Sequence, residues 1–288
     1  MRLSVLQRKM YTIFGPKTEQ WASQNLSMAL KSAQIEMRPA AWLASALFYT
    51  LIALVASLVI LSILLLAILP SLGLFLHPAL IILGSLGIAG LTYLVFILLP
   101  ASIAKTRGKK INNNLAYAMN FISAMSSAGV TPDEIFKSLS KQDIYGEIKN
   151  EASSIYRDVE LMGEDIVTAV KKNIDRTPSE KFAEFLQGLI VTVTSGGSLK
   201  TYFVAKSNQF MQENRQEEKQ LLETLGIMAE SYVTAAVAGV LLLFIVIPIM
   251  MIINGDPSQL MFLYVLIFLV VPLIHMGFAF AIRSMGGE

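Results

Sequence analysis

Two stretches organise this chain: Phe121-Ile-Ser-Ala-Met-Ser-Ser-Ala-Gly129-Val-Thr131-Pro-Asp-Glu-Ile-Phe136 and Gly188-Leu-Ile-Val-Thr-Val-Thr-Ser-Gly196-Gly-Ser198-Leu-Lys-Thr-Tyr-Phe203. In each, an apolar helical stripe runs into a glycine, a hydroxyl residue follows two positions later, and a phenylalanine follows seven positions after the glycine. A glycine after a helix adopts the left-handed conformation at little cost, and Ser or Thr then caps the next helix. Both stretches are therefore predicted to be helix–turn–helix hairpins. They are either a weak internal repeat or two unrelated hairpins of one bundle.

The segment that holds both hairpins, residues 101–230, is charged but balanced, with sixteen basic and sixteen acidic residues from Ala101 to Met228. Thr131-Pro132-Asp133-Glu134 and Thr177-Pro178-Ser179-Glu180 both fit a capping box with proline at the first helical position. Glu164 and Asp165, after Gly163, supply favourable charge for another helix start. Apolar stripes between these signals predict about six helices, enough for a bundle with its own core.

The composition outside this segment is that of a membrane protein. The chain has 288 residues, of which 54% are hydrophobic and only 15% charged, whereas a soluble globular protein carries roughly 25% charged residues. Four uncharged runs are each long enough to cross a bilayer core, which takes about 20 apolar residues. They are Trp42–Leu69, Ala79–Leu99, Ser231–Ile253 and Gln259–Ile282. The sequence therefore predicts an all-α integral membrane protein, with transmembrane hairpins over residues 42–100 and 231–282 flanking the bundle.

The distribution of Lys and Arg predicts the orientation of these spans. Four basic residues follow the second run at once, Arg283 follows the fourth, and the loops at residues 71–78 and 254–258 carry no Lys or Arg. Because cytoplasmic loops are enriched in Lys and Arg, we expect a multi-pass protein of the cytoplasmic (inner) membrane. Its N-terminus, its bundle and its tail at residues 283–288 would all be cytoplasmic.

Residues 1–41 are predicted to form cytoplasmic amphipathic helices rather than a cleaved signal peptide, because no apolar core follows the basic start. Their net charge is +4, and Gly15-Pro16 separates two apolar stripes. Such helices suit an anionic membrane surface, but they could equally pack on the bundle.

Signals of catalysis are missing from the sequence. There is no Cys, the histidines are His77 and His275, and no phosphate-binding loop or zinc-protease motif occurs. We therefore expect no catalytic residues, no metal, no cofactor, no enzymatic activity and no nucleic-acid partner. For His275, a neutral hydrogen-bonded side chain is favoured over a functional ionisable group.

The order of these motifs resembles the type II secretion system F-domain family, the inner-membrane platform proteins of type IV filament machines. The resemblance rests on the hairpin at Phe121–Leu139, on Gly163-Glu-Asp-Ile and on Ser195-Gly-Gly-Ser-Leu199, which a long helix follows. It implies a six-helix cytoplasmic domain without catalysis of its own, coupled to a hexameric secretion ATPase. Many members carry two F domains and this chain carries one, so the resemblance also implies pairing with a second copy or a sister F-domain subunit.

The expected function is therefore a non-enzymatic platform for a type IV pilus-like, archaellum-like or type II secretion filament. It would couple the ATPase to the movement of pilin-like subunits. The alternative is a transporter or channel subunit. The four runs lack Asp, Glu, Lys and Arg, which counts against this alternative because ion-coupled transporters usually bury such residues.

A candidate partner-binding surface combines a basic cluster with the two hairpin turns. Its residues are Lys105, Arg107, Lys109, Lys110, Gly129, Thr131, Ser195, Gly196, Gly197 and Ser198. The cluster is either a topology signal, a landing site for anionic lipid, or part of the contact with the ATPase. The turns could equally face a second copy of the domain.

Overall fold

The structure is a computed structural model that describes residues 18, 23–35, 37–68, 76–254 and 259–286. Every regular element in these ranges is a helix. The chain divides into two compact units, residues 1–210 and 211–288, and each is described by itself. Most of the predicted N-terminal helices and most of both predicted outer loops lie outside the described residues.

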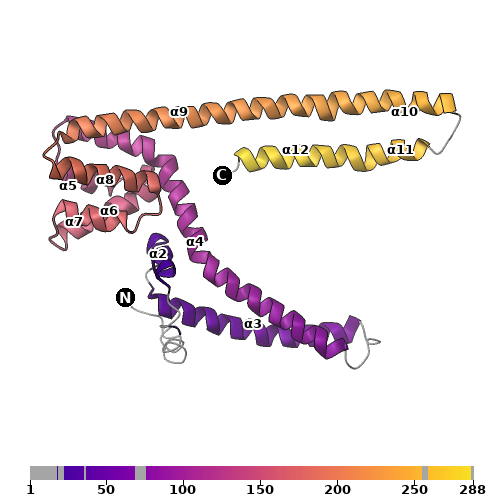
Figure 1. Cartoon of the computed structure of the whole chain (residues 1–288), viewed down its shortest axis with the longest axis horizontal. Helices are drawn as coiled ribbons and strands as arrows, with labels where there is room; N and C mark the ends of the chain where they lie inside the picture. Colours follow the sequence, from indigo (N-terminus) through magenta and orange to yellow (C-terminus); the bar gives the residue numbers. More distant parts are fainter. Residues whose placement is uncertain (1–17, 19–22, 36, 69–75, 255–258, 287–288) are drawn as a thin grey trace. The chain divides into compact units, whose positions relative to one another are not determined.

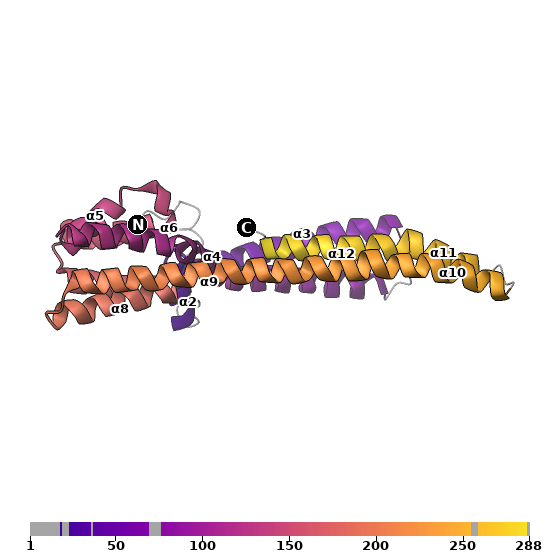
Figure 2. The ribbon, with the colours of Figure 1, turned by 90° about the horizontal axis from the view of Figure 1, so that it is seen from above.

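The first unit holds two long helices and a group of shorter ones (Figures 1 and 2). Its helices are α2 (Gln24–Ser32), α3 (Pro39–Ile68), α4 (Leu76–Ser127), α5 (Pro132–Leu139), the 3₁₀ turn η1 (Asp143–Tyr145), α6 (Glu147–Glu160), α7 (Ile166–Ile174), α8 (Glu180–Thr194) and the first part of α9 (Leu199–Tyr232). Helices α3 and α4 pack against each other, and the later part of α4 contacts α5, α6 and α8.

Helix α4 runs through Pro100, where the sequence predicted that the second span would end. A proline inside a helix leaves the carbonyl four residues earlier without its usual N–H donor. For Pro100 that carbonyl belongs to Phe96, and the indole Nε1 of Trp42 donates to it over 3.1 Å. The aromatic rings of Trp42 and Tyr49 also lie against Phe96. Helix α3 thus replaces the hydrogen bond that Pro100 removes, and α4 continues from the apolar run into the charged segment.

Helix α4 approaches the start of α8 closely. A Cβ atom on Gly108 would lie 2.8 Å from the backbone oxygen of Pro178, so only glycine allows this approach. One turn later, the hydroxyl of Ser179 donates to Asn112 Oδ1 over 2.5 Å. The same hydroxyl accepts from the backbone N–H of Phe182, so Ser179 caps α8. The predicted capping box was placed two residues too early, at Thr177.

Aromatic residues form the interface between α8 and α9. Phe182, Phe185 and Phe203 are fully buried. The hydroxyl of Tyr202 donates to the backbone oxygen of Phe185 over 2.7 Å, and burial raises the pKa of Tyr202 to about 12. The ring of Tyr202 occupies the space that a side chain at position 188 would need, which explains the glycine there.

The predicted turn glycines adopt left-handed conformations, with φ of +81° at Gly129 and +67° at Gly196. Ser198 caps α9 as predicted, accepting from the backbone N–H of Thr201 over 3.3 Å. Thr131 lies at the N-cap of α5, but its side chain makes no capping hydrogen bond, so that capping box was wrong. Glu134, its predicted partner, pairs instead with Lys137 over 3.0 Å.

The second unit is a helical hairpin that begins within α9. Its further elements are the π-helical η2 (Val233–Gly239), α10 (Val240–Asn254), α11 (Gln259–Val265), the π-helical η3 (Leu266–Val270) and α12 (Val271–Gly286). The π turns of η3 lie directly before Pro272, whose ring would crowd the carbonyl of Phe268 in a regular α-helix. The wider π turn provides room for that ring.

Four helical segments are long and apolar enough to cross a membrane, as predicted. They are Pro39–Ile63, Pro78–Ser127, Leu199–Ile253 and Leu260–Ser284. The second and third are about twice the length of a span, because each continues without a break into the charged segment.

Replacing Gly129 or Gly196 by valine tests the left-handed turns. Valine is strained at positive φ, so each change should cost on the order of 1–2 kcal/mol of stability. Thermal unfolding of the full chain in neutral detergent measures the loss. Gly226→Val is the matched control, because Gly226 lies within α9 with open space around it. Unchanged unfolding of both turn variants would contradict the assigned conformations.

Candidate partner-binding surface

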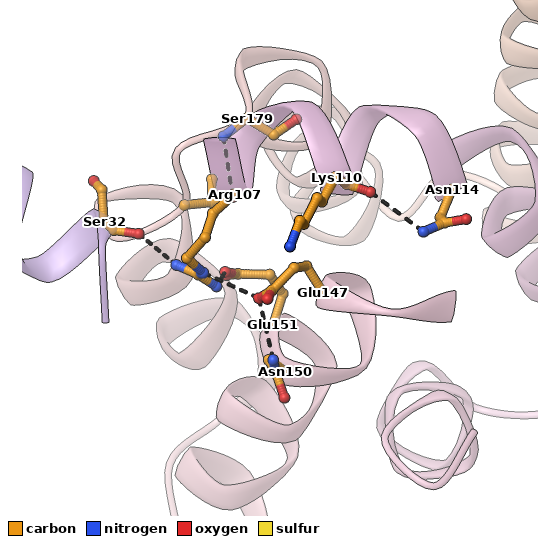
Figure 3. Close-up of polar contacts among 9 residues, drawn as sticks. Ser32, Arg107, Lys110, Asn114, Glu147, Asn150, Glu151 and Ser179 are labelled. Carbon is orange, nitrogen blue, oxygen red and sulfur yellow. Dashed lines mark hydrogen bonds and ion pairs between the residues drawn. The ribbon is translucent and has the colours of Figure 1, made fainter. Parts of the chain in front are cut away.

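Arg107 is the member of the basic cluster that points into the protein. Its Nε donates to Glu147 Oε2 over 3.0 Å and its Nη2 to Glu151 Oε1 over 2.8 Å, both on α6. Its Nη1 donates to the backbone oxygen of Ser32, the last residue of α2. Figure 3 shows the guanidinium between these groups. The prediction that Arg107 presents its charge to a partner was therefore wrong, because its side chain is only 9% exposed.

The two carboxyl groups around Arg107 respond differently to it. For Glu151, burial raises the pKa above its ordinary value, although the charge of Arg107 offsets part of this effect. For Glu147, burial acts in the same direction, but the hydrogen bonds from Asn150 and Arg107 outweigh it and hold the pKa below its ordinary value. Glu151 is the more deeply buried of the two, and it depends on Arg107 for its counter-charge.

The three lysines of the cluster are solvent-exposed. Lys105, Lys109 and Lys110 are exposed on α4, and Lys110 lies near Glu147 (Figure 3). None of the three forms an ion pair within the part of the chain that the structure describes. These side chains are thus available to an acidic partner or to lipid phosphate.

The hairpin turns lie at the other end of the bundle from the lysines. From Lys105 to Ser127, the 1.5 Å rise per residue of α4 gives a separation of roughly 33 Å. Both α5 and α9 begin at the left end of the bundle in Figures 1 and 2, so the two turns share that end. The turn residues Gly129, Thr131 and Ser195–Ser198 are all exposed. The predicted surface is therefore two separate patches, one of lysines and one of turns.

Sequence reasoning missed Glu147 and Glu151 as partners of Arg107. The sequence of α6 did contain a signal that Glu151 is buried. Glu151 lies inside the apolar stripe of Ile148, Ala152 and Ile155, all of which are buried. A carboxylate in such a stripe needs a buried cation, because an unpaired buried charge is strongly unfavourable.

Groups that could perform chemistry are sparse. No cluster of three His, Cys, Asp or Glu side chains suited to a metal occurs among the residues described. His275 Nδ1 lies 2.8 Å from the backbone oxygen of Val271, and the imidazole meets the ring of Tyr232 edge to face. The predicted hydrogen bond of His275 is therefore confirmed.

Comparison with known proteins gives one family. Residues 118–247 match the sequence profile of "Type II secretion system (T2SS), protein F". An uncharacterized protein of Methanocaldococcus jannaschii is 32% identical over 200 residues, which are 66% of this chain and 33% of that protein. The flagella accessory protein J of the same organism is 26% identical over 186 residues, or 60% of this chain and 33% of that protein.

The chain spans about a third of the length of these two curated relatives. No solved structure matches it. The profile match covers both hairpin turns, the buried aromatic interface and the start of the third apolar segment. Residues 118–247 therefore form a domain that matches the F domain of the type II secretion system family.

Proposed function

We propose that the chain is a non-enzymatic membrane platform on which a type IV pilus-like, archaellum-like or type II secretion filament is assembled. The observation that carries this proposal is the F domain at residues 118–247, lying in sequence between two pairs of membrane-length helical segments. The relative named flagella accessory protein J favours a filament of the archaellum type.

In the proposed topology, the bundle at residues 101–230 faces the cytoplasm. The N-terminal residues 1–41 and the tail at residues 283–288 lie on the same side, and the hairpins at residues 42–100 and 231–282 cross the membrane. The support is the absence of Lys and Arg from both interhelical loops, against the lysines that follow the second apolar run.

A cytoplasmic secretion ATPase is the proposed partner of the turn patch. The turns are exposed and held by rigid helices, which suits them for specific contact. Helix α4 joins one turn to a membrane span without any intervening loop. A force applied at Gly129 would therefore move the span of α4 and, through it, the pilin-like subunits beside that span.

The lysines would attract the ATPase over a longer distance than the turns. Lys105, Lys109 and Lys110 form an exposed positive patch on a segment with no net charge. Charges of this kind increase the rate of encounter and weaken with salt. A second copy of the chain or a sister F-domain subunit is proposed to complete the platform.

The filament function predicts a cellular phenotype. In cells lacking this chain, surface filaments or secretion of filament subunits should fall to background, and the wild-type chain should restore them. Electron microscopy of cells with matched pilin levels measures this. Normal filaments in the deletion strain would contradict the proposal.

The lysine patch predicts salt-sensitive binding of the ATPase. With Lys105, Lys109 and Lys110 changed to Gln, the full chain in neutral detergent should bind the ATPase several-fold more weakly at low salt. The two proteins should converge at high salt. The control variant carries Lys141→Gln and Lys171→Gln, two exposed lysines outside both patches.

Topology must be intact for this comparison. A single cysteine at Ser140 should react with an impermeant thiol reagent only after cells are opened, whereas one at Gly255 should react in intact cells. The reverse pattern would overturn the proposed orientation. Equal ATPase affinity and equal salt dependence of the Lys-to-Gln variant and the wild type would reduce the lysines to a topology signal.

A further inference from the structure

A cavity of about 520 Å³ lies in the first unit between α2, the start of α3, α6 and α7. It is separate from the lysine patch and the turn patch. The side chains that matter for its chemistry are Lys31, Arg38, Ser154, Arg157, Asn173 and Arg176. Two of the elements that line the cavity, α2 and α6, are joined by the hydrogen bonds of Arg107.

The lining of this cavity has an excess of positive charge. Lys31 and Arg38 form no ion pair within the described ranges. Arg157 and Arg176 both pair with Asp158, at 3.6 Å and 2.8 Å. Glu151 also lines the cavity, but its carboxylate pairs with Arg107. Four cations thus line one cavity. The nearby carboxylates, Glu151 and Asp158, already pair with arginines.

Two buried polar atoms in the lining lack a partner. Within the described residues, three buried side-chain atoms have none, and two of these are Arg176 Nε and Asn173 Oδ1. Asn173 is fully buried. A buried donor or acceptor is unfavourable unless it is paired. An anionic oxygen would satisfy Arg176 Nε, and a hydroxyl would satisfy Asn173 Oδ1.

The cavity adjoins the point where the chain enters the apolar span. Arg38 and Pro39 line it, and the membrane-length segment begins at Pro39. Basic pockets beside the cytoplasmic ends of spans suit the phosphate groups of anionic lipids. The location therefore favours a lipid headgroup as the source of the anion.

We propose that this cavity binds a phosphate ester that also carries a hydroxyl group, supplied by the phosphoglycerol headgroup of an anionic lipid. Arg176, Lys31 and Arg38 would hold the phosphate oxygens, and Asn173 would accept from the headgroup hydroxyl. The proposal concerns the lipid contact of the first span, and it stands independently of the filament function.

Retention of lipid by the purified full chain tests the site. Native mass spectrometry in neutral detergent should detect bound phosphatidylglycerol in preference to phosphatidylcholine. The double variant Lys31→Gln, Arg38→Gln should bind phosphatidylglycerol at least about ten-fold more weakly, because it removes two charges that pair with no carboxylate among the described residues. Ser154→Glu, which adds a negative charge to the lining, should have the same effect.

Matched controls separate the cavity from general surface charge. The variant Lys141→Gln, Lys171→Gln removes two exposed lysines that have no ion pair among the residues described and do not line the cavity, and it should bind as the wild type does. Thermal unfolding of each variant confirms that it is folded. Equal lipid retention by the wild type, the cavity double variant and Ser154→Glu would overturn the proposal.

Competition identifies the source of the phosphate. Glycerol 1-phosphate should displace phosphatidylglycerol weakly, and inorganic phosphate more weakly still, because each lacks part of the lipid contact. Binding of glycerol phosphate as tight as that of the lipid, lost in the same variants, would keep the phosphate site and overturn its lipid source. Failure of every phosphate compound to bind would overturn the site itself.

Discussion

The guanidinium of Arg107 is a permanent charge whose side chain is only 9% exposed, and the surrounding structure has to neutralise it. It does so with two carboxylates of α6 and the carbonyl that ends α2. Removing one partner of a buried ion pair typically costs about 3–5 kcal/mol, because the other charge remains buried. The position of α6 on α4, and of α2 beside both, therefore depends on this residue. The basic cavity next to it depends on the same arrangement, since Glu151 faces both Arg107 and the cavity.

A second feature is the absence of a joint between the bundle and the second span. The hydrogen bond from Trp42 to Phe96 lets α4 continue through Pro100, and the glycine at position 108 lets the same helix lie against the start of α8. Helix α4 thus links a membrane-length segment to the turn at Gly129 as one rigid element. This continuity gives a mechanical reason to propose that an ATPase acting on the bundle moves the membrane helices. A loop at Pro100 would absorb much of the same displacement.

The sequence predicted the four apolar segments and both turn glycines, because length, hydrophobicity and left-handed glycine leave strong local patterns. It did not predict the burial of Arg107. The topology argument counts every Lys and Arg that flanks a span, and it treats each of them as an exposed cation. Pro100 was misread as a helix end because Trp42, which donates to the carbonyl of Phe96 in place of the missing N–H, lies 54 positions from Phe96 in sequence. Thr131 was misread as a capping box because Glu134 has a competing partner in Lys137. The errors at Arg107 and Pro100 concern pairings between residues far apart in sequence, and the separation of the lysines from the turns follows from the length of α4.

A double-mutant cycle on Arg107 and Glu151 tests the central claim, that their ion pair fixes α6 on α4. The full chain and the variants Arg107→Met, Glu151→Gln and the double variant are compared in neutral detergent. Native-state hydrogen exchange of the amides of α6 gives the free energy of local opening in each. We predict that each single change lowers this free energy by about 3 kcal/mol. The double change should cost less than the sum, with a coupling of about 1–3 kcal/mol. Additive effects, or single changes that each cost under about 0.5 kcal/mol, would show that α6 is held without this ion pair.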